Sequence, residues 1–187
     1  AEALAADPGR LEALACWVTA LAWAAGDDPD AASLKSAHRM MSHALGRAQG
    51  RPDLLAAQAR LLALTPGEAS AREALAAARG AAAIAPDGRD ALLALGESLL
   101  AADPAAAASH LERAWEAWRD PRALRLAALA RWRAGDAGAA LDRLARRLQI
   151  DPAQPEALEL QVQVEVGLDR LDAARATLKR WGRLDAG

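Results

Sequence analysis

The sequence predicts an all-α protein in which antiparallel helix pairs stack into a single array. Two observations carry this prediction. Ala, Leu, Arg and Glu dominate the 187 residues, whereas Phe, Tyr and Asn are absent, and this alphabet favours helices over strands. Proline also recurs at nearly constant spacing, at Pro8, Pro52, Pro86, Pro121 and Pro152. A period near 34 residues is typical of repeats that each contain two helices.

The prolines divide the chain into about five units. Each proline can open a helix, because its missing N–H would have no partner there and its φ is already helical. We predict units at about 7–50, 51–84, 85–119, 120–150 and 151–184, the first with an insertion of about ten residues. Residues 1–187 are expected to form one array. Residues 1–6 are expected to be the end of a preceding helix, so the chain would be a piece of a longer protein.

Within each unit, two helical segments flank a short break. The breaks are Asp103-Pro104, Gly135-Asp136 and the stretch from Gly167 to Asp169, and breaks this short allow only an antiparallel turn. Each helix has an apolar stripe that it cannot cover alone, so neighbouring units must stack. The predicted helices are Ala91–Ala102, Ala105–Arg119, Leu124–Ala134, Ala137–Ile150, Leu158–Val166 and Leu171–Trp181.

This arrangement resembles the tetratricopeptide (TPR) repeat family over essentially the whole chain. The matching residues are the small residue of the second helix, the large apolar residue four positions later and the terminal proline. They include Ala74, Ala140, Ala174, Leu144 and Leu178, and the third unit adds Leu95-Gly96. The resemblance implies a right-handed superhelical α-solenoid whose concave face holds an extended or helical peptide. The family's aromatic positions in the first helix are mostly Leu or Ala here. The fourth unit is short by about three residues and the first has an insertion of about ten, so irregular packing is expected in those two units.

Several classes of function are disfavoured. The net charge of −2 gives no general attraction to nucleic acid or to an anionic membrane. No apolar run reaches the roughly 18 residues of a membrane-spanning helix. The sequence has no phosphate-binding glycine motif, no nucleophile elbow and no zinc-protease motif. We therefore expect no catalysis in this chain, no cofactor and no bound metal.

Two segments contain metal-ligating residue types. His38, Met40, Met41 and His43 would suit a soft metal such as copper, but gap-filling Met and peripheral His on an amphipathic helix is the preferred interpretation. Whether they bind a metal is left open. The acidic stretch at 26–30 suggests calcium, yet it lacks the later Glu and the internal Gly of an EF-hand loop. A solvated capping loop is favoured there.

Three isolated residues are interpreted structurally. Cys16 has no nearby His to act as a base, so a buried or half-buried structural thiol is predicted. Trp17 and Trp23 are six positions apart, so one is expected in the core and the other could face the groove. His110 stands alone on a second helix and is expected at the surface.

The main candidate site is a basic helix in the fourth unit. The segment from Glu112 to Arg147 is net basic. Guanidinium groups can bind carboxylates and phosphates through two parallel hydrogen bonds and can stack on aromatic rings. In the family's register, the predicted peptide-binding groove consists of Arg122, Arg125, Leu129, Trp132 and Arg133, with Glu97 and Gln163 from neighbouring units. The alternative is that these arginines are solvated and paired with acidic residues one turn away.

The sequence thus predicts a protein–protein interaction scaffold or adaptor that is not an enzyme. Its partner would be a protein or a peptide, and an acidic segment of that partner would suit the basic helix. The alternative is a substrate-recognition module of a larger bacterial enzyme or assembly machine, such as a glycosyltransferase or the c-type cytochrome assembly system. Nucleic-acid binding is disfavoured, because Glu97, Glu156 and Glu159 interrupt the basic stripe. The Lys and Asn residues of the chaperone-tail carboxylate clamp are missing.

Two further properties remain open at this level. An exposed terminal repeat could support homo-oligomers, because terminal repeats need a polar outer face. The compartment is undetermined between the bacterial cytoplasm and the periplasm, since the single cysteine, Cys16, gives no disulfide pattern.

Overall fold

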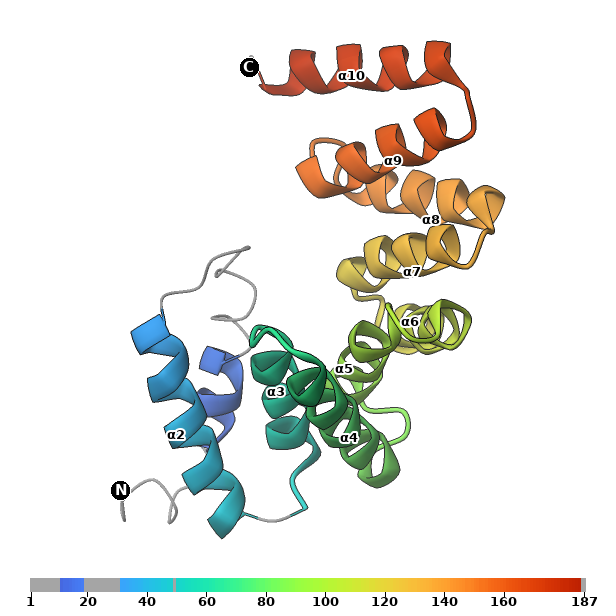
Figure 1. The fold of residues 1–187 in the computed structure, drawn as a ribbon. Coiled ribbons are helices and arrows are strands. Elements are labelled where there is room, and N and C mark those ends of the chain that lie inside the picture. The colour runs from blue at the N-terminus through green and yellow to red at the C-terminus, as the bar shows by residue number, and fades with distance from the viewer. Residues whose placement is uncertain (1–10, 19–30, 49, 186–187) are drawn as a thin grey trace. The chain divides into compact units, whose positions relative to one another are not determined.

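The computed structural model describes residues 11–18, 31–48 and 50–185, and every regular element in these ranges is an α-helix (Figure 1). Residues 11–18 are helical and precede the first labelled helix. The labelled helices are α2 (Ala31–Arg47), α3 (Pro52–Ala63), α4 (Glu68–Ile84), α5 (Arg89–Leu99), α6 (Pro104–Trp118), α7 (Pro121–Arg133), α8 (Ala137–Ile150), α9 (Pro155–Gly167) and α10 (Leu171–Asp185). The predicted all-α class is confirmed.

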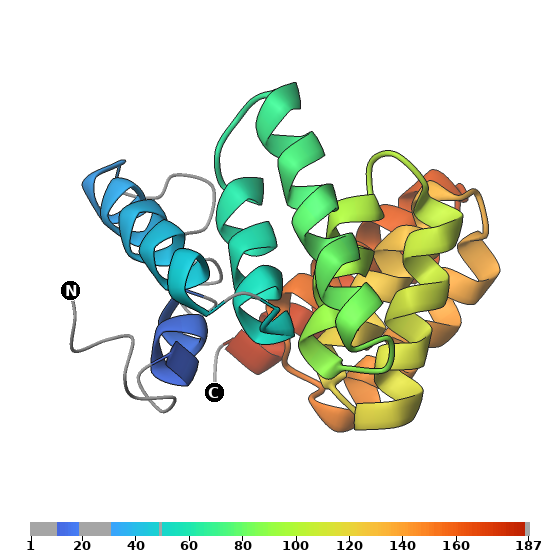
Figure 2. The same cartoon turned by 90° about the horizontal axis from the view of Figure 1, so that it is seen from below.

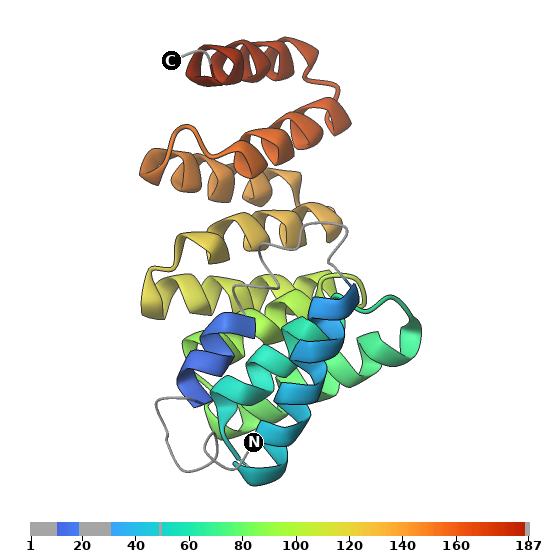
Figure 3. The same ribbon diagram turned by 90° about the vertical axis from the view of Figure 1, so that its left-hand side faces the viewer.

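The chain divides into two compact units, which are described separately. Unit 1 is Ala1–Ser98 and unit 2 is Leu99–Gly187. In unit 1, α3 packs along α4, and both views in Figures 1 and 2 show the two helices side by side. In unit 2, each helix from α6 to α10 packs on the next, and Figure 3 shows α7 to α10 as successive layers.

The core of unit 1 joins residues 11–18, α2 and α3. Its largest fully buried members include Val18, Met41, Leu54 and Leu61. These apolar residues recur at helical spacing on each helix, so their burial follows from the amphipathic pattern. Fully burying one such side chain contributes about 1.5–3 kcal/mol.

The core of unit 2 uses alanine where helices approach and leucine between them. Ala140 and Ala174, predicted as small packing residues, are 0% and 4% exposed, and Ala128 is completely buried. Leu144 and Leu158 fill the space between α7, α8 and α9. A small side chain lets two helices approach closely, and the neighbouring leucines then restore the close packing of a protein interior.

Proline and aspartate together start several helices. Pro52, Pro104 and Pro121 stand in the first turns of α3, α6 and α7, as their fixed φ predicts. Asp103 and Asp136 accept hydrogen bonds of 3.0 Å from the backbone N–H groups of Ala106 and Ala139. These carboxylates satisfy N–H groups that have no partner within the helix.

Two of the helix starts expected at prolines differ from the structure. Pro86 and Pro152 lie in turns, and α5 and α9 begin three residues later, at Arg89 and Pro155. The turn before α9 is held by Asp151, whose carboxylate accepts a 3.2 Å hydrogen bond from the N–H of Ala153. A short Asp side chain that bonds its own backbone two residues on favours a turn over immediate helix entry.

The turns after α7 and after α9 share one geometry. Gly135 and Asp169 adopt left-handed conformations, with φ of 84° and 57°. After α7, the N–H of Gly135 donates to Trp132 and the N–H of Asp136 donates to Arg131, which is a Schellman motif. The turn after α9 repeats this pattern with Asp169 at the left-handed position, so the break in the last unit occurs there and Gly167 is still helical.

The environments of two isolated residues, Cys16 and His110, differ from those expected from the sequence. Cys16 is exposed, because residues 11–18 bury the opposite face that contains Leu14 and Val18. His110 is half-buried on α6, and burial together with the charge of Arg113 lowers its pKa below the ordinary value.

Other predictions about side chains fall on α2 or outside the described residues. Met41 is buried in the core of unit 1, whereas Met40 and His43 are exposed, so Met41 does not share a face with the other two. The Nε2 atom of His38 lies 3.1 Å from the hydroxyl of Thr65. Trp23 and the acidic stretch at 26–30 lie outside the described residues, and Trp17 is 42% exposed.

Candidate functional site

Helix α7 supplies five of the seven predicted groove residues. Arg122, Arg125, Leu129 and Trp132 follow one another at spacings of three and four positions, which places them along one side of a helix. Arg133 adjoins Trp132 at the last helical position. Other sides of α7 are buried, with Ala123, Leu124, Leu126, Ala127, Ala128 and Ala130 packed inside unit 2. We call the five predicted groove residues of α7 the α7 stripe: Arg122, Arg125, Leu129, Trp132 and Arg133.

The first arginine of the α7 stripe is held by the residue that caps the helix. Asp120 accepts a hydrogen bond from the N–H of Arg122 and forms a two-pronged ion pair with the guanidinium of Arg122, at 3.0 Å to Nε and 2.7 Å to the terminal nitrogen. The Asp120 side chain is only 2% exposed, so the pair is sheltered from solvent. Arg122 is therefore fixed in place, and part of its charge is compensated.

Arg125 has no such partner. Among the residues that the structure describes, no carboxylate or carbonyl group forms a hydrogen bond or ion pair with its guanidinium, and the side chain is half-buried. Arg133 is exposed and donates one long hydrogen bond of 3.4 Å to the carbonyl oxygen of Leu100. Arg125 and Arg133 are therefore the positions on α7 where charge is available to an external anion.

The apolar part of the α7 stripe also packs within unit 2. Leu129 and Trp132 are partly buried against the core formed with α8 and α9. The Trp132 indole rests on Gly167 of α9 so closely that a Cβ atom at that glycine would lie 2.4 Å from the ring. Trp132 thus connects α7 with α9, the first helices of two successive repeats, and only part of the indole surface is exposed to solvent.

The other two predicted groove residues, Gln163 and Glu97, make hydrogen bonds within their own units. Gln163 is exposed on α9 and donates to Glu159 one turn earlier, at 3.2 Å. Glu97 lies in unit 1, where its carboxylate accepts a 3.0 Å hydrogen bond from Nε of the buried Arg60. Arg60 also pairs with Asp90 at 3.3 Å. The seven residues stay a predicted groove, with α7 basic and the exposed surface of α9 acidic.

A second set of arginines serves the packing of unit 2. Arg131 of α7 makes a two-pronged ion pair with Glu112 of α6, at 3.0 and 2.7 Å, and Arg143 of α8 approaches the same carboxylate at 2.9 Å. Burial alone would raise the pKa of Glu112, but the hydrogen bond from Arg131 and the charges of Arg143 and Arg131 lower it overall. The ionised carboxylate ties three helices together, so these two arginines pair across helices and not with acidic residues one turn away on their own helix.

This network gives a first prediction. Replacing Glu112 by Gln should lower the free energy of unfolding by about 1–3 kcal/mol at neutral pH, since two arginines lose their charged partner. Because the pKa of Glu112 is lower in the folded than in the unfolded chain, its contribution is present above the ordinary value of 4.5 and disappears as the pH falls through the folded value. Urea unfolding of both proteins across this pH range measures the difference.

The matched control is Glu116→Gln, since Glu116 is an exposed residue on the same helix, α6. It should change the free energy of unfolding by less than about 0.5 kcal/mol at every pH. A loss that is equally large for both variants, or one that persists in acid for Glu112→Gln, would contradict the role of the three-helix ion pair.

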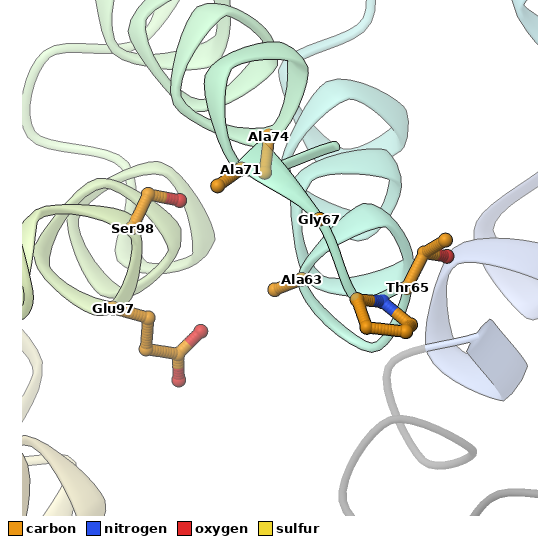
Figure 4. A pocket seen from close by; sticks show the side chains of 8 residues that line it. Ala63, Thr65, Gly67, Ala71, Ala74, Glu97 and Ser98 are labelled. Carbon is orange, nitrogen blue, oxygen red and sulfur yellow. The ribbon is translucent and has the colours of Figure 1, made fainter. Parts of the chain in front are cut away.

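Sequence reasoning did not find a pocket in unit 1. Figure 4 shows it between the end of α3, the loop into α4 and helix α5, with Glu97 and Ser98 facing Ala63 and Gly67 across the opening. Its signal in the sequence is the small residue at Ala63, where the corresponding position of α7 has Trp132. Within the described ranges, no group of His, Cys, Asp and Glu side chains is arranged to hold a metal ion.

Comparison with known proteins decides the fold. No family model matches the sequence, and a search of the curated proteins finds no match either. Solved structures do match: MamA from Desulfovibrio magneticus RS-1 superposes with a TM-score of 0.71 at 17% identity, over 92% of this chain and 96% of that chain. The chain has the fold of tetratricopeptide repeats.

Two other TPR structures agree. PilF of Pseudomonas aeruginosa has a TM-score of 0.71 at 16% identity, over 92% of this chain and 77% of that chain. The Cut9 chain of the APC/C hetero-tetramer Cut9–Hcn1 has a TM-score of 0.72 at 12% identity, over 90% of this chain but only 31% of its own length. The predicted resemblance is therefore confirmed at the level of the fold. In addition, none of the helices in the described ranges has the length and apolar content needed to cross a bilayer.

Proposed function

We propose that this TPR array is a protein–protein interaction scaffold that binds a peptide segment of a partner on the α7 stripe, and that the bound segment presents an acidic group. One observation carries the proposal: Arg125 is a half-buried guanidinium without a counter-ion among the described residues. A charge that is partly removed from water is costly unless it is paired. A carboxylate or phosphate supplied by a partner would pair it.

The surroundings of Arg125 support a defined direction of binding. The ion pair with Asp120 fixes Arg122 one turn before it, and Leu129 with Trp132 provides a partly exposed apolar surface one to two turns after it. Glu156 and Glu159 make the exposed surface of α9 acidic. A segment with an acidic residue beside an apolar one would thus bind along α7, and repulsion from α9 would disfavour the reversed placement.

The test uses peptides selected on the whole chain. A random peptide library displayed on phage is enriched on the wild-type protein, and the dissociation constants of the selected peptides are measured by fluorescence anisotropy. Replacing Arg125 by Glu should raise the dissociation constants of these peptides about 10-fold or more. A charge-assisted hydrogen bond contributes about 1.5–3 kcal/mol, and the variant loses it. The loss should shrink as salt is added.

The matched control is Arg146→Glu, because Arg146 is an exposed arginine of α8 in the same unit. It makes the same change in net charge and should alter the affinity by less than about threefold. Selected peptides without acidic residues, or equal losses in the two variants, would show that the α7 stripe is not the binding site. A recognition module of a larger enzyme would use the same surface and would give the same result.

A further inference from the structure

The pocket in unit 1 has the properties of a side-chain receptor. It has a volume of about 240 Å³, is open to solvent on one side, and is lined by Ala63, Thr65, Pro66, Gly67, Ala71, Ala74, Glu97 and Ser98. All of these residues belong to unit 1, so the pocket is complete within that unit. An enclosed cavity of about 150 Å³ holds a benzene molecule, whereas pockets for drug-sized ligands start at about 300 Å³. The size therefore fits one aromatic side chain.

The repeat explains why the pocket exists. Helices α3 and α7 both begin at a proline, Pro52 and Pro121, and Ala63 and Trp132 each stand eleven residues further along. In unit 2, the Trp132 indole spans from α7 to α9 and rests on Gly167. In unit 1, the methyl group of Ala63 leaves the corresponding space between α3 and α5 unfilled. The pocket thus occupies the space that an aromatic ring fills at the corresponding position of unit 2.

The polar groups of the pocket favour a ring that carries a hydrogen-bond donor. The alanines and Pro66 make apolar walls, while the Glu97 carboxylate and the Ser98 side chain lie on the α5 side (Figure 4). Glu97 is held in place because its Oε2 accepts from Arg60 at 3.0 Å. Its side chain remains 24% exposed, so the carboxylate can still accept a further bond. Apolar walls with a few fixed polar groups are the usual composition of a binding pocket.

We infer that this pocket binds an aromatic side chain with an N–H donor, an indole, supplied by a partner segment. The ring would lie against Ala63, Ala71 and Ala74, and its N–H would donate to the carboxylate of Glu97 or to the hydroxyl of Ser98. The inference rests on the proposed function only in that a partner supplies the ring. The fit of the pocket to an indole is independent of that partner.

The experiment uses 5-fluoroindole as the probe, followed by ¹⁹F NMR so that the protein's own tryptophans do not interfere. The whole wild-type chain should give a saturable shift of the fluorine resonance. Replacing Ala63 by Leu fills the pocket and should weaken binding by about 10-fold or more, whereas Ala76→Leu, on the exposed side of α4, should bind as the wild type does. No saturable shift, or equal binding by Ala63→Leu, would overturn the inference.

Two additions keep the result decisive. Circular dichroism shows whether Ala63→Leu is folded, and Ala63→Val is the smaller change to use if it is not. 5-Fluorobenzofuran has the same shape but no N–H group, so it should bind at least about fivefold more weakly than 5-fluoroindole. Equal affinities would overturn the assignment of a donor to Glu97 or Ser98.

The outcome is separable from that of the proposed function. Arg125→Glu lies in unit 2 and should leave the binding of 5-fluoroindole unchanged. Loss of peptide binding in Arg125→Glu together with no indole binding by the wild type would refute the pocket and leave the α7 stripe standing. Indole binding that is lost in Ala63→Leu, with peptides indifferent to Arg125→Glu, would support the pocket and refute the α7 stripe.

Discussion

Replacing Leu144 by Ala is expected to lower the free energy of unfolding by about 3 kcal/mol or more. Leu144 of α8 is completely buried in the core of unit 2, among side chains of α7 and α9. Truncation removes the transfer energy of three carbon atoms and leaves a cavity, because packed helices relax only partly. Such a loss is a large share of the 5–15 kcal/mol that usually stabilises a domain.

The chain contains a matched control for this prediction. Leu178 of α10 holds the same place in the repeat as Leu144, yet it is 50% exposed. Leu178→Ala should therefore cost less than about 1 kcal/mol. Urea unfolding followed by circular dichroism measures both variants, and a loss for Leu178→Ala as large as that for Leu144→Ala would mean that the last helix is covered in solution.

These two leucines show what the sequence could and could not predict. The all-α class, the alanine packing positions and the antiparallel turns follow from composition, spacing and turn residues, and they agree with the structure. Whether a given repeat position is covered depends on the neighbouring layer, which the pattern of one helix does not contain. Leu144 and Leu178 look alike in sequence and differ only in what lies above them.

The helix starts illustrate a second limit. Pro52 and Pro121 open helices as predicted, because the missing N–H of proline would have no partner in the first turn of a helix. Pro86 and Pro152 recur at similar spacing but lie in turns. At Pro152 the N–H of Ala153 donates a hydrogen bond to the Asp151 side chain, which favours a turn over a helix. Proline spacing alone does not reveal this contact.

The candidate site was predictable to a similar degree. Arg122, Arg125, Leu129 and Trp132 all lie on α7, where helical periodicity puts them along one side. It could not separate Arg125, which has no acidic partner among the described residues, from arginines that have one, because Glu112 reaches Arg131 and Arg143 across separations of 19 and 31 residues. Contacts of this kind depend on the register between helices, which only the structure supplies.

The second large effect is expected at Trp132. Replacing Trp132 by Ala should lower the free energy of unfolding by about 2–3 kcal/mol, less than for a fully buried tryptophan because part of the ring is open to solvent. The indole rests directly on Gly167, so the two positions should not be independent. Gly167→Ala alone should displace the ring and cost about 1–3 kcal/mol, offset by up to about 1 kcal/mol of helix propensity.

A double-mutant cycle separates the energy of the contact between Trp132 and Gly167 from the separate effects of each substitution on its own helix. Once Trp132 is Ala, a methyl group at position 167 meets no ring, so Gly167→Ala should become neutral or stabilising by up to about 1 kcal/mol. Urea unfolding of the four proteins gives the coupling energy directly. Equal effects of Gly167→Ala in both backgrounds would show that the ring does not rest on this glycine. A clear coupling would establish that this repeat position holds a ring against the glycine of α9 in unit 2, whereas the same position in unit 1 is Ala63, which lines the pocket.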